Sequence, residues 1–122
     1  MAQDHPAALE AKISVTGVRD QHLGPRWERA RASVTVEAAE RFELVNLTGD
    51  AEAEQCGYID RFVQALFNYI AATSAVSPSK LRLTIESVEH DFESSLMAFQ
   101  RAGEDAGRKI VEAIRSRLSS AG

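Results

Sequence analysis

Apolar residues recur with two different periods along the chain, and the order of these periods constrains the fold more than any other feature. Between residues 59 and 70 they are spaced three and four positions apart, as on one face of an α-helix. Between residues 81 and 86 they alternate with polar residues, which is typical of a strand with one buried face. A chain that contains both patterns predicts helices packed on a sheet.

Two strands are expected before that helix. Residues 11–16 and residues 32–38 both alternate apolar with polar side chains, as half-buried strands do. The run between them, residues 20–30, carries arginines and has Gly24 and Pro25 near its centre. We therefore expect a polar loop between the two strands.

A third extended segment, residues 41–47, follows and should pair with its neighbours, with Phe42 and Leu44 pointing inward. The amphipathic helix is then expected from about residue 53 to residue 73. Pro78 prevents it from continuing, because the residue before a proline is driven toward extended geometry.

Residues 80–88 predict a fourth strand, and a second amphipathic helix begins after a pair of serines that can cap its first amides. The order strand, strand, strand, helix, strand, helix predicts an α+β fold. We expect a mixed sheet of about four strands with two helices packed on one face. We expect one domain over residues 11–118, between flexible ends at residues 1–10 and 119–122.

The composition argues against several classes of ligand. With 18 acidic and 14 basic residues, the net charge is -4, whereas free-standing nucleic-acid binders usually carry a basic excess, so we do not expect long-range attraction to RNA or DNA. The single cysteine, Cys56, cannot form an internal disulfide, and the three histidines are not spaced as metal ligands. The glycine-rich phosphate-binding motifs are absent from the sequence. We expect no DNA, no nucleotide, no metal and no other cofactor.

The first residues include acidic side chains and a proline, where a signal peptide needs a basic start and an apolar run. No stretch approaches the roughly 20 consecutive apolar residues of a membrane span. We therefore expect a cytoplasmic protein that does not bind membranes. A Ser-His-Asp group could be drawn from Ser94, His90 and Asp91, but the strand-to-turn-to-helix context of such a nucleophile is missing. An enzyme is the least favoured class.

The stretch "RWERAR" is a first candidate binding site. It places Trp27 between Arg26 and Arg29, and a basic loop with an aromatic residue can contact RNA phosphates and stack on a base. The alternative is a solvated loop whose tryptophan packs against the edge of the core.

The stretch "EHDFESS" is a second candidate. Asp91 and Glu93 precede the last helix, where acidic side chains favour the positive end of the helix dipole. In that structural interpretation, His90 is an incidental turn residue.

The longer stretch "EHDFESSLMAFQRAG", residues 89–103, resembles a segment of domain IV of elongation factor G. That segment reads tyrosine, histidine, a variable residue, valine, aspartate, serine, serine, glutamate, methionine, alanine, phenylalanine. The matching residues are His90, Ser94, Ser95, Met97, Ala98, Phe99 and Ala102. Glu93 stands for aspartate and Leu96 for glutamate. "FELVN" at residues 42–46 is similar to a second motif of the family, and the resemblance spans roughly residues 13–102.

The resemblance implies the fold of ribosomal protein S5 domain 2, with a left-handed strand-helix-strand crossover. It also implies a non-catalytic role in translation, because the family's domain is an arm that contacts transfer RNA and messenger RNA through two loops at its tip. The corresponding residues here are His90, Asp91, Glu93 and Ser94 in one loop and Arg26, Trp27 and Arg29 in the other. We expect these residues to contact the ribosome, through ribosomal RNA or transfer RNA.

The sequence also departs from the family pattern. Only Gly24 remains of a glycine-rich tip loop, and Glu89 replaces the tyrosine before His90, which adds negative charge where phosphates would come. After Gly103 the chain continues into a longer helix. Together with the acidic net charge, these departures favour an alternative: a protein-interaction or structural module, such as a homodimer, that kept the fold and lost the RNA contact.

Overall fold

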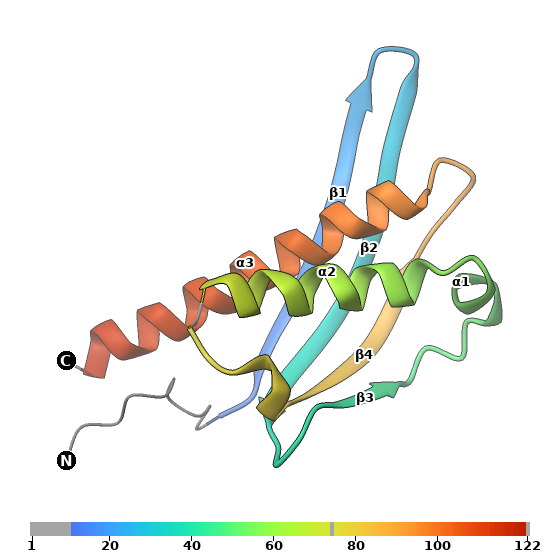
Figure 1. Ribbon diagram of the computed structural model, residues 1–122. Helices are drawn as coiled ribbons and strands as arrows, with labels where there is room; N and C mark the ends of the chain where they lie inside the picture. Colours follow the sequence, from blue (N-terminus) through green and yellow to red (C-terminus); the bar gives the residue numbers. More distant parts are fainter. Residues whose placement is uncertain (1–10, 74, 122) are drawn as a thin grey trace.

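The computed structural model describes residues 11–73 and 75–121. Its elements, in chain order, are β1 (Ile13–Leu23), β2 (Arg26–Ala38), β3 (Glu43–Asn46), α1 (Ala51–Gln55), α2 (Tyr58–Thr73), a 3-10 turn (Pro78–Lys80), β4 (Leu81–Glu89) and α3 (Leu96–Ala121) (Figure 1). The strands form one mixed sheet in the order β1-β2-β4-β3, in which only β3 and β4 are parallel. The expected α+β fold with a four-stranded mixed sheet is confirmed.

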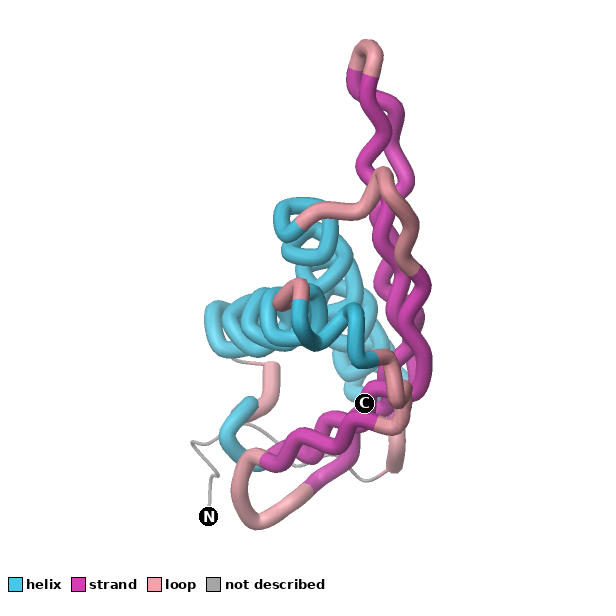
Figure 2. Tube along the Cα trace, turned by 90° about the vertical axis from the view of Figure 1, so that its right-hand side faces the viewer, coloured by secondary structure: helices cyan, strands magenta, loops and turns pink. Residues whose placement is uncertain are grey.

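Both long helices, α2 and α3, cover the same face of the sheet (Figures 1 and 2). Alternate residues of the central strands point into this interface, and those that are almost completely buried are Val34, Val36, Leu81, Leu83 and Ile85. The helices meet them with Phe62, Leu66, Ile70, Phe99 and Ile110, which are equally buried. The two periods of the sequence thus meet in one apolar core.

The opposite face of the sheet is polar. Ser14 and Thr35 join their hydroxyls across β1 and β2 at 2.8 Å, and Thr16 and Ser33 do so at 2.9 Å. Such cross-strand pairs suit a face that water can reach, because a hydroxyl can exchange its partner for solvent. Among the described residues, this face carries no helix (Figure 2).

The connection from β3 to β4 passes through α2 on the covered face. With β3 pointing upward and α2 in front of the sheet, β4 lies to the left of β3, so this crossover is left-handed (Figure 1). Crossovers between parallel strands are right-handed in about 98% of cases. The uncommon hand agrees with the S5 domain 2-like fold and with the expectation from the sequence.

The helix expected over residues 53–73 is divided into two. α1 ends at Gln55 and is capped by Cys56, and Gly57 then adopts a positive φ of 78°, which ends the helix. Asp50 caps the start of α1 by accepting a hydrogen bond from the backbone N–H of Ala53 at 3.0 Å. The apolar period does not reveal this break, because Ala53 and Ile59 are both buried on the same side.

The polar loop expected over residues 20–30 is instead mostly strand. Only Gly24 and Pro25 form the turn, and Gly24 has a φ of 61°, as the first position of a two-residue hairpin turn requires. His22 pairs with Trp27 across the strands. The arginines and the tryptophan suggested a loop. Trp27, Arg29 and Arg31 instead occupy alternate positions of β2, so their side chains share one face of a long hairpin.

The outer part of the β1–β2 hairpin projects beyond both helices (Figures 1 and 2). We call residues 19–31 the ribbon. β4 ends its pairing with β2 at Arg31 and Glu89, so the ribbon continues outward as two strands. It therefore has the shape of an arm, although the arm is a hairpin and not a loop.

The strand expected over residues 41–47 is the shorter β3, Glu43–Asn46. Of the two residues expected to point inward, one is partly buried and the other is exposed. Phe42 is partly buried and meets Phe67 edge-on, with ring centroids 5.3 Å apart. Leu44 is 42% exposed, which contradicts the expectation that it points into the core. It lies on β3, one of the two edge strands of the sheet, where fewer neighbours cover it.

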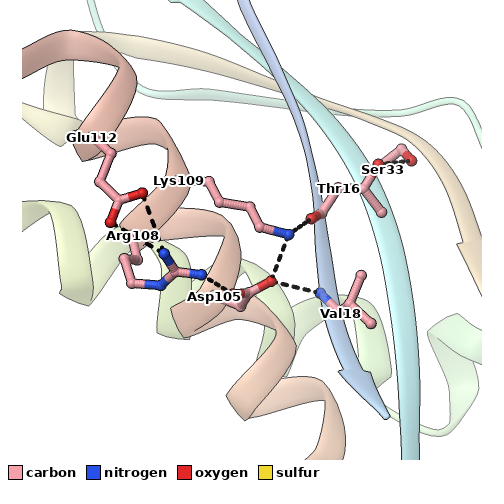
Figure 3. A network of polar contacts seen from close by, with 7 residues as sticks. All are labelled: Thr16, Val18, Ser33, Asp105, Arg108, Lys109 and Glu112. Atoms are coloured by element: carbon pink, nitrogen blue, oxygen red, sulfur yellow. Dashed lines mark hydrogen bonds and ion pairs between the residues drawn. The ribbon is translucent and has the colours of Figure 1, made fainter. Parts of the chain in front are cut away.

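The helix α3 also covers part of the free edge of β1 (Figure 3). Asp105 accepts a hydrogen bond from the backbone N–H of Val18 at 3.0 Å, and Lys109 donates to the backbone oxygen of Thr16 at 2.7 Å. Burial alone would raise the pKa of Asp105, but hydrogen bonds from Lys109, Val18 and Arg108 outweigh burial and lower it. Side chains of α3 thus occupy backbone groups that could otherwise pair with another strand.

The ends of the chain bear on the expected domain limits. α3 continues to Ala121, past residue 118 where the domain was expected to end, while residues 1–10 lie outside the described part. Within residues 11–73 and 75–121, no helix combines the length and the apolar character needed to cross a bilayer.

Candidate functional site

The candidate site lies where the ribbon leaves the sheet. A hollow of about 410 Å³ is found there, and its lining comes from β1, β2, the end of β4 and the loop that follows it: Val18, Arg19, Asp20, Arg29, Ala30, Arg31, Glu89, His90 and Asp91. The two stretches singled out in the sequence, around Trp27 and around His90, are therefore brought close together by the fold.

The loop between β4 and α3 is fastened to the ribbon through Arg29. The hydroxyl of Ser94 donates to the backbone oxygen of Arg29 at 2.7 Å, and the backbone N–H of Arg29 points to the backbone oxygen of Glu93 at 3.4 Å. The Arg29 guanidinium lies 3.6 Å from a carboxylate oxygen of Asp91. Four of the expected site residues thus form one continuous surface.

Trp27 stands on the ribbon face that the helices leave uncovered. Its ring stacks on His22 with centroids 4.6 Å apart and planes 10° from parallel, and the guanidinium carbon of Arg29 lies 4.6 Å from the same ring. The Trp27 side chain is 37% exposed. It is therefore neither in a loop nor packed on the core. Arg26 pairs with Leu23 beside the turn, but its side chain lies outside what the structure describes.

The side chain of His90 is held against α1, which corrects the expectation that it projects from a tip. Its side chain is 14% exposed, and its Nε2 lies 2.9 Å from Oδ2 of Asp50. Nδ1 lies 3.6 Å from a carboxylate oxygen of Glu52, and the ring leans on Tyr58. The amide of Ala53 and then His90 lower the pKa of Asp50. His90 therefore links the end of β4 to the start of α1.

The two expected loops also do not end at one common tip. The Gly24–Pro25 turn lies well beyond the loop between β4 and α3, which reaches only part of the way along the ribbon (Figure 2). The candidate site is consequently a side of the ribbon, near its base, and not the extreme end of the molecule.

Two residues of this region, His22 and Phe92, were missed by the sequence reasoning. His22 belongs to the same ribbon face as Trp27 and Arg31, and Phe92 is 93% exposed in the loop next to Asp91. A signal existed for Phe92, because it is a large apolar residue between two acidic ones where neither a helical nor a strand period requires it. For His22 the signal was its register opposite Trp27, which only a hairpin assignment would reveal.

The described arginines of the ribbon differ in how firmly they are paired. Arg19 binds Glu28 at 2.8 Å, and that glutamate is only 8% exposed. Arg29 lies 3.6 Å from Asp20, and Arg31 lies 3.9 Å from Glu89, with all four side chains substantially exposed. Long, exposed ion pairs contribute at most about 1 kcal/mol. Arg29 and Arg31 can therefore exchange their carboxylates for another anion, whereas Arg19 stays paired with Glu28.

Ser94, His90 and Asp91 do not converge into a nucleophile relay. The Ser94 hydroxyl donates to Arg29, and His90 is hydrogen-bonded to Asp50 and not to Asp91 or Ser94. Among residues 11–73 and 75–121, no cluster of three or more histidine, cysteine or acidic side chains could hold a metal ion. The chemistry offered by the site is recognition by arginine and aromatic groups.

Comparison with known proteins adds information on the fold. No protein-family model matches the chain, and no curated protein matches it. A crystal structure of a protein from Thermus thermophilus is similar, with a TM-score of 0.67 and 16% sequence identity. The chain shares its fold with part of that protein. The similarity covers 85% of this chain but 17% of the other one, so the chain spans a small part of that protein's length.

Proposed function

We propose that the protein binds RNA of the translation machinery through the uncovered face of the ribbon, without catalysing a reaction. The observation that carries this proposal is the grouping of Trp27, His22, Arg29 and Arg31 on one face of a projecting hairpin. Aromatic and guanidinium groups stack on unpaired bases, and arginines contact phosphates. The resemblance of residues 89–103 to elongation factor G domain IV supports the link to translation.

The ion pairs of the ribbon are compatible with this role. Arg29 and Arg31 hold their carboxylates at 3.6 and 3.9 Å, so an RNA phosphate can replace these partners at little cost. A guanidinium forms shorter, bidentate bonds with phosphate. Because the chain has a net charge of -4, attraction at long range is absent and the binding should be weak and salt-sensitive.

The test is co-sedimentation with ribosomes at low and at high salt. The wild-type protein is compared with Arg29→Ala/Arg31→Ala, and a matched control, Arg41→Ala/Arg115→Ala, removes the same charge from two exposed arginines outside the ribbon. We expect pelleting at low salt that the ribbon variant loses and the control keeps. Equal pelleting of both variants, or none by the wild type even at low salt, would contradict the proposal.

A second candidate function is a protein-interaction module, including a homodimer. The observation that favours it is that Arg19, Arg29 and Arg31 each lie within 4.0 Å of a carboxylate, so the ribbon presents mixed charge. Alternating charges suit a protein surface better than a phosphate backbone. A solution mass that rises with protein concentration would support the homodimer, while a strict monomer that pellets with ribosomes would favour RNA binding.

A further inference from the structure

Exposed apolar side chains gather at the start of α3. Six large hydrophobic residues of the described chain are exposed, and three of these lie within six positions: Phe92 at 93%, Leu96 at 40% and Met97 at 44%. The core does not need them, because Ala98 and Phe99 of the same helical turn are already fully buried. We call Phe92, Leu96 and Met97 the apolar cap.

A hollow adjoins the apolar cap at the corner between α1 and α2. Its volume is about 370 Å³, and Leu96 lines it together with Cys56, Gly57 and Asp60. Leu96 rests against Gly57, where even a methyl group would lie 3.4 Å from its Cδ2 atom. The hollow is therefore partly apolar, and its volume can accept one large anchor side chain from a partner.

The charges around the apolar cap are mainly negative. Asp91 and Glu93 flank Phe92 in the loop, and Asp60 borders the hollow. Two cations lie among these carboxylates: Arg61 also lines the hollow and donates a hydrogen bond to the side-chain oxygen of Gln100 at 3.0 Å, and the Arg29 guanidinium lies 3.6 Å from Asp91. A partner that covers this surface must therefore bring apolar groups surrounded by positive charge.

We infer that the apolar cap and its hollow form a docking surface for an amphipathic protein helix with a basic polar face. Such a helix would place an apolar anchor in the hollow and contact Phe92, Leu96 and Met97 with its apolar stripe. Its lysines or arginines would face Asp60, Asp91 and Glu93. RNA fits this surface poorly, because carboxylates flank the exposed phenylalanine. The apolar cap lies outside the ribbon face proposed to bind RNA, and the two surfaces meet at Asp91, which also faces Arg29.

The test is an NMR titration of the isotope-labelled full chain with a synthetic helical peptide of leucine and lysine, about 14 residues or four turns long. A peptide with glutamate in place of every lysine is the control. We expect shift changes confined to residues 55–64 and 91–97, and at least about tenfold weaker binding of the glutamate peptide. Changes spread over all acidic surfaces, or equal binding of both peptides, would overturn the inference.

A variant localises the binding without altering charge. Phe92→Ser/Leu96→Gln/Met97→Gln changes only exposed side chains, and unchanged spectra elsewhere verify its fold. We expect its affinity for the leucine-lysine peptide to fall at least about tenfold. The control, Leu44→Gln/Leu47→Gln, alters exposed apolar residues away from α3 and should bind as the wild type does. A triple variant with wild-type affinity, or oligouridylate shifting residues 55–64 and 96–97 in place of the peptide, would refute the docking surface.

Discussion

The two halves of the β1–β2 hairpin are built from the same pair of strands but are held together differently. In the inner half, Ala32, Val34 and Val36 are buried beneath the helices. In the outer half, side chains pair mainly between the two strands, as in the His22–Trp27 stack and the pair of Arg29 with Asp20, and the contacts of Arg29 with the loop between β4 and α3 support its base. The fold is stabilised mainly by the inner half, so the outer half is free to take the binding role proposed for it.

The two halves should differ in how much each interaction contributes to stability. A fully buried valine side chain contributes about 1.5–3 kcal/mol to stability. A cross-strand pair on a solvated face contributes about 0.2–1 kcal/mol. Substitutions in the inner half should therefore act on unfolding, and substitutions in the ribbon should act on binding. Changes at Gly17, Asp105 and His22 can test that division.

The largest effect is expected at Gly17, in the inner half. A methyl group at this position would collide with the backbone oxygen of Ala102 and lie 2.8 Å from Cβ of Ala106. Gly17→Ala should lower the free energy of unfolding by about 3 kcal/mol, measured by urea denaturation.

A second glycine of the same hairpin provides the control. In the turn, a Cβ on Gly24 would meet no atom within 4 Å, and its φ of 61° is one that asparagine tolerates. Gly24→Asn should therefore change the stability by about 1 kcal/mol or less. If both variants lose the same stability, the inner half is not held by the close contact with α3.

An intermediate effect is expected at Asp105, which joins α3 to the edge of β1. Asp105→Asn removes the charge that Lys109 and Arg108 face, and should cost about 2 kcal/mol near pH 7. Thermal and urea unfolding would measure the loss. As a control, Glu104→Gln removes one negative charge from the neighbouring, exposed position and should leave stability nearly unchanged.

The same carboxylate should make stability depend on pH. Its pKa is lower in the folded protein than in the unfolded chain, so its contribution is present above about pH 4 and is lost as the pH falls through the folded value. The wild type should lose stability in acid, and Asp105→Asn should lose less over the same interval. If the free energy of unfolding falls equally with pH in the two proteins, the charge of Asp105 does not hold α3 to the edge of β1.

The smallest effect on stability is expected in the ribbon. His22→Ala removes the stack on Trp27 and should lower the free energy of unfolding by about 0.5–1 kcal/mol. Because Trp27 is the single tryptophan, its fluorescence reports directly on the change in its surroundings. A loss comparable to that of Gly17→Ala would show that the two halves of the hairpin are not independent.

The sequence predicts those parts of the fold that have a regular apolar period. β4, the buried face of α2 and the inner half of β2 follow from spacing alone, because each repeats apolar residues toward the core. The ribbon could not be assigned in this way. Its side chains find partners on the opposite strand, so no continuous apolar pattern marks residues 19–31 as extended.

The candidate site was only partly predictable for a related reason. Arg29 and Trp27 were found by composition, but the position of His90 depends on Asp50, which is forty residues earlier and whose local role is to cap α1. A hydrogen bond between distant segments leaves no periodic signal. The direction of a polar side chain in a short connection therefore follows from the tertiary structure.

The ribbon ends in a two-residue turn, Gly24 and Pro25, so its length can change only in whole residues added to or removed from both strands. Side chains alternate between the faces of a strand, so adding two residues to each strand would move the turn outward by about 7 Å and keep every cross-strand pair on its present face. Adding one residue to each strand would instead reverse the faces of everything beyond the insertion. The length of the ribbon and the side chains on its faces can thus vary without any change in the core.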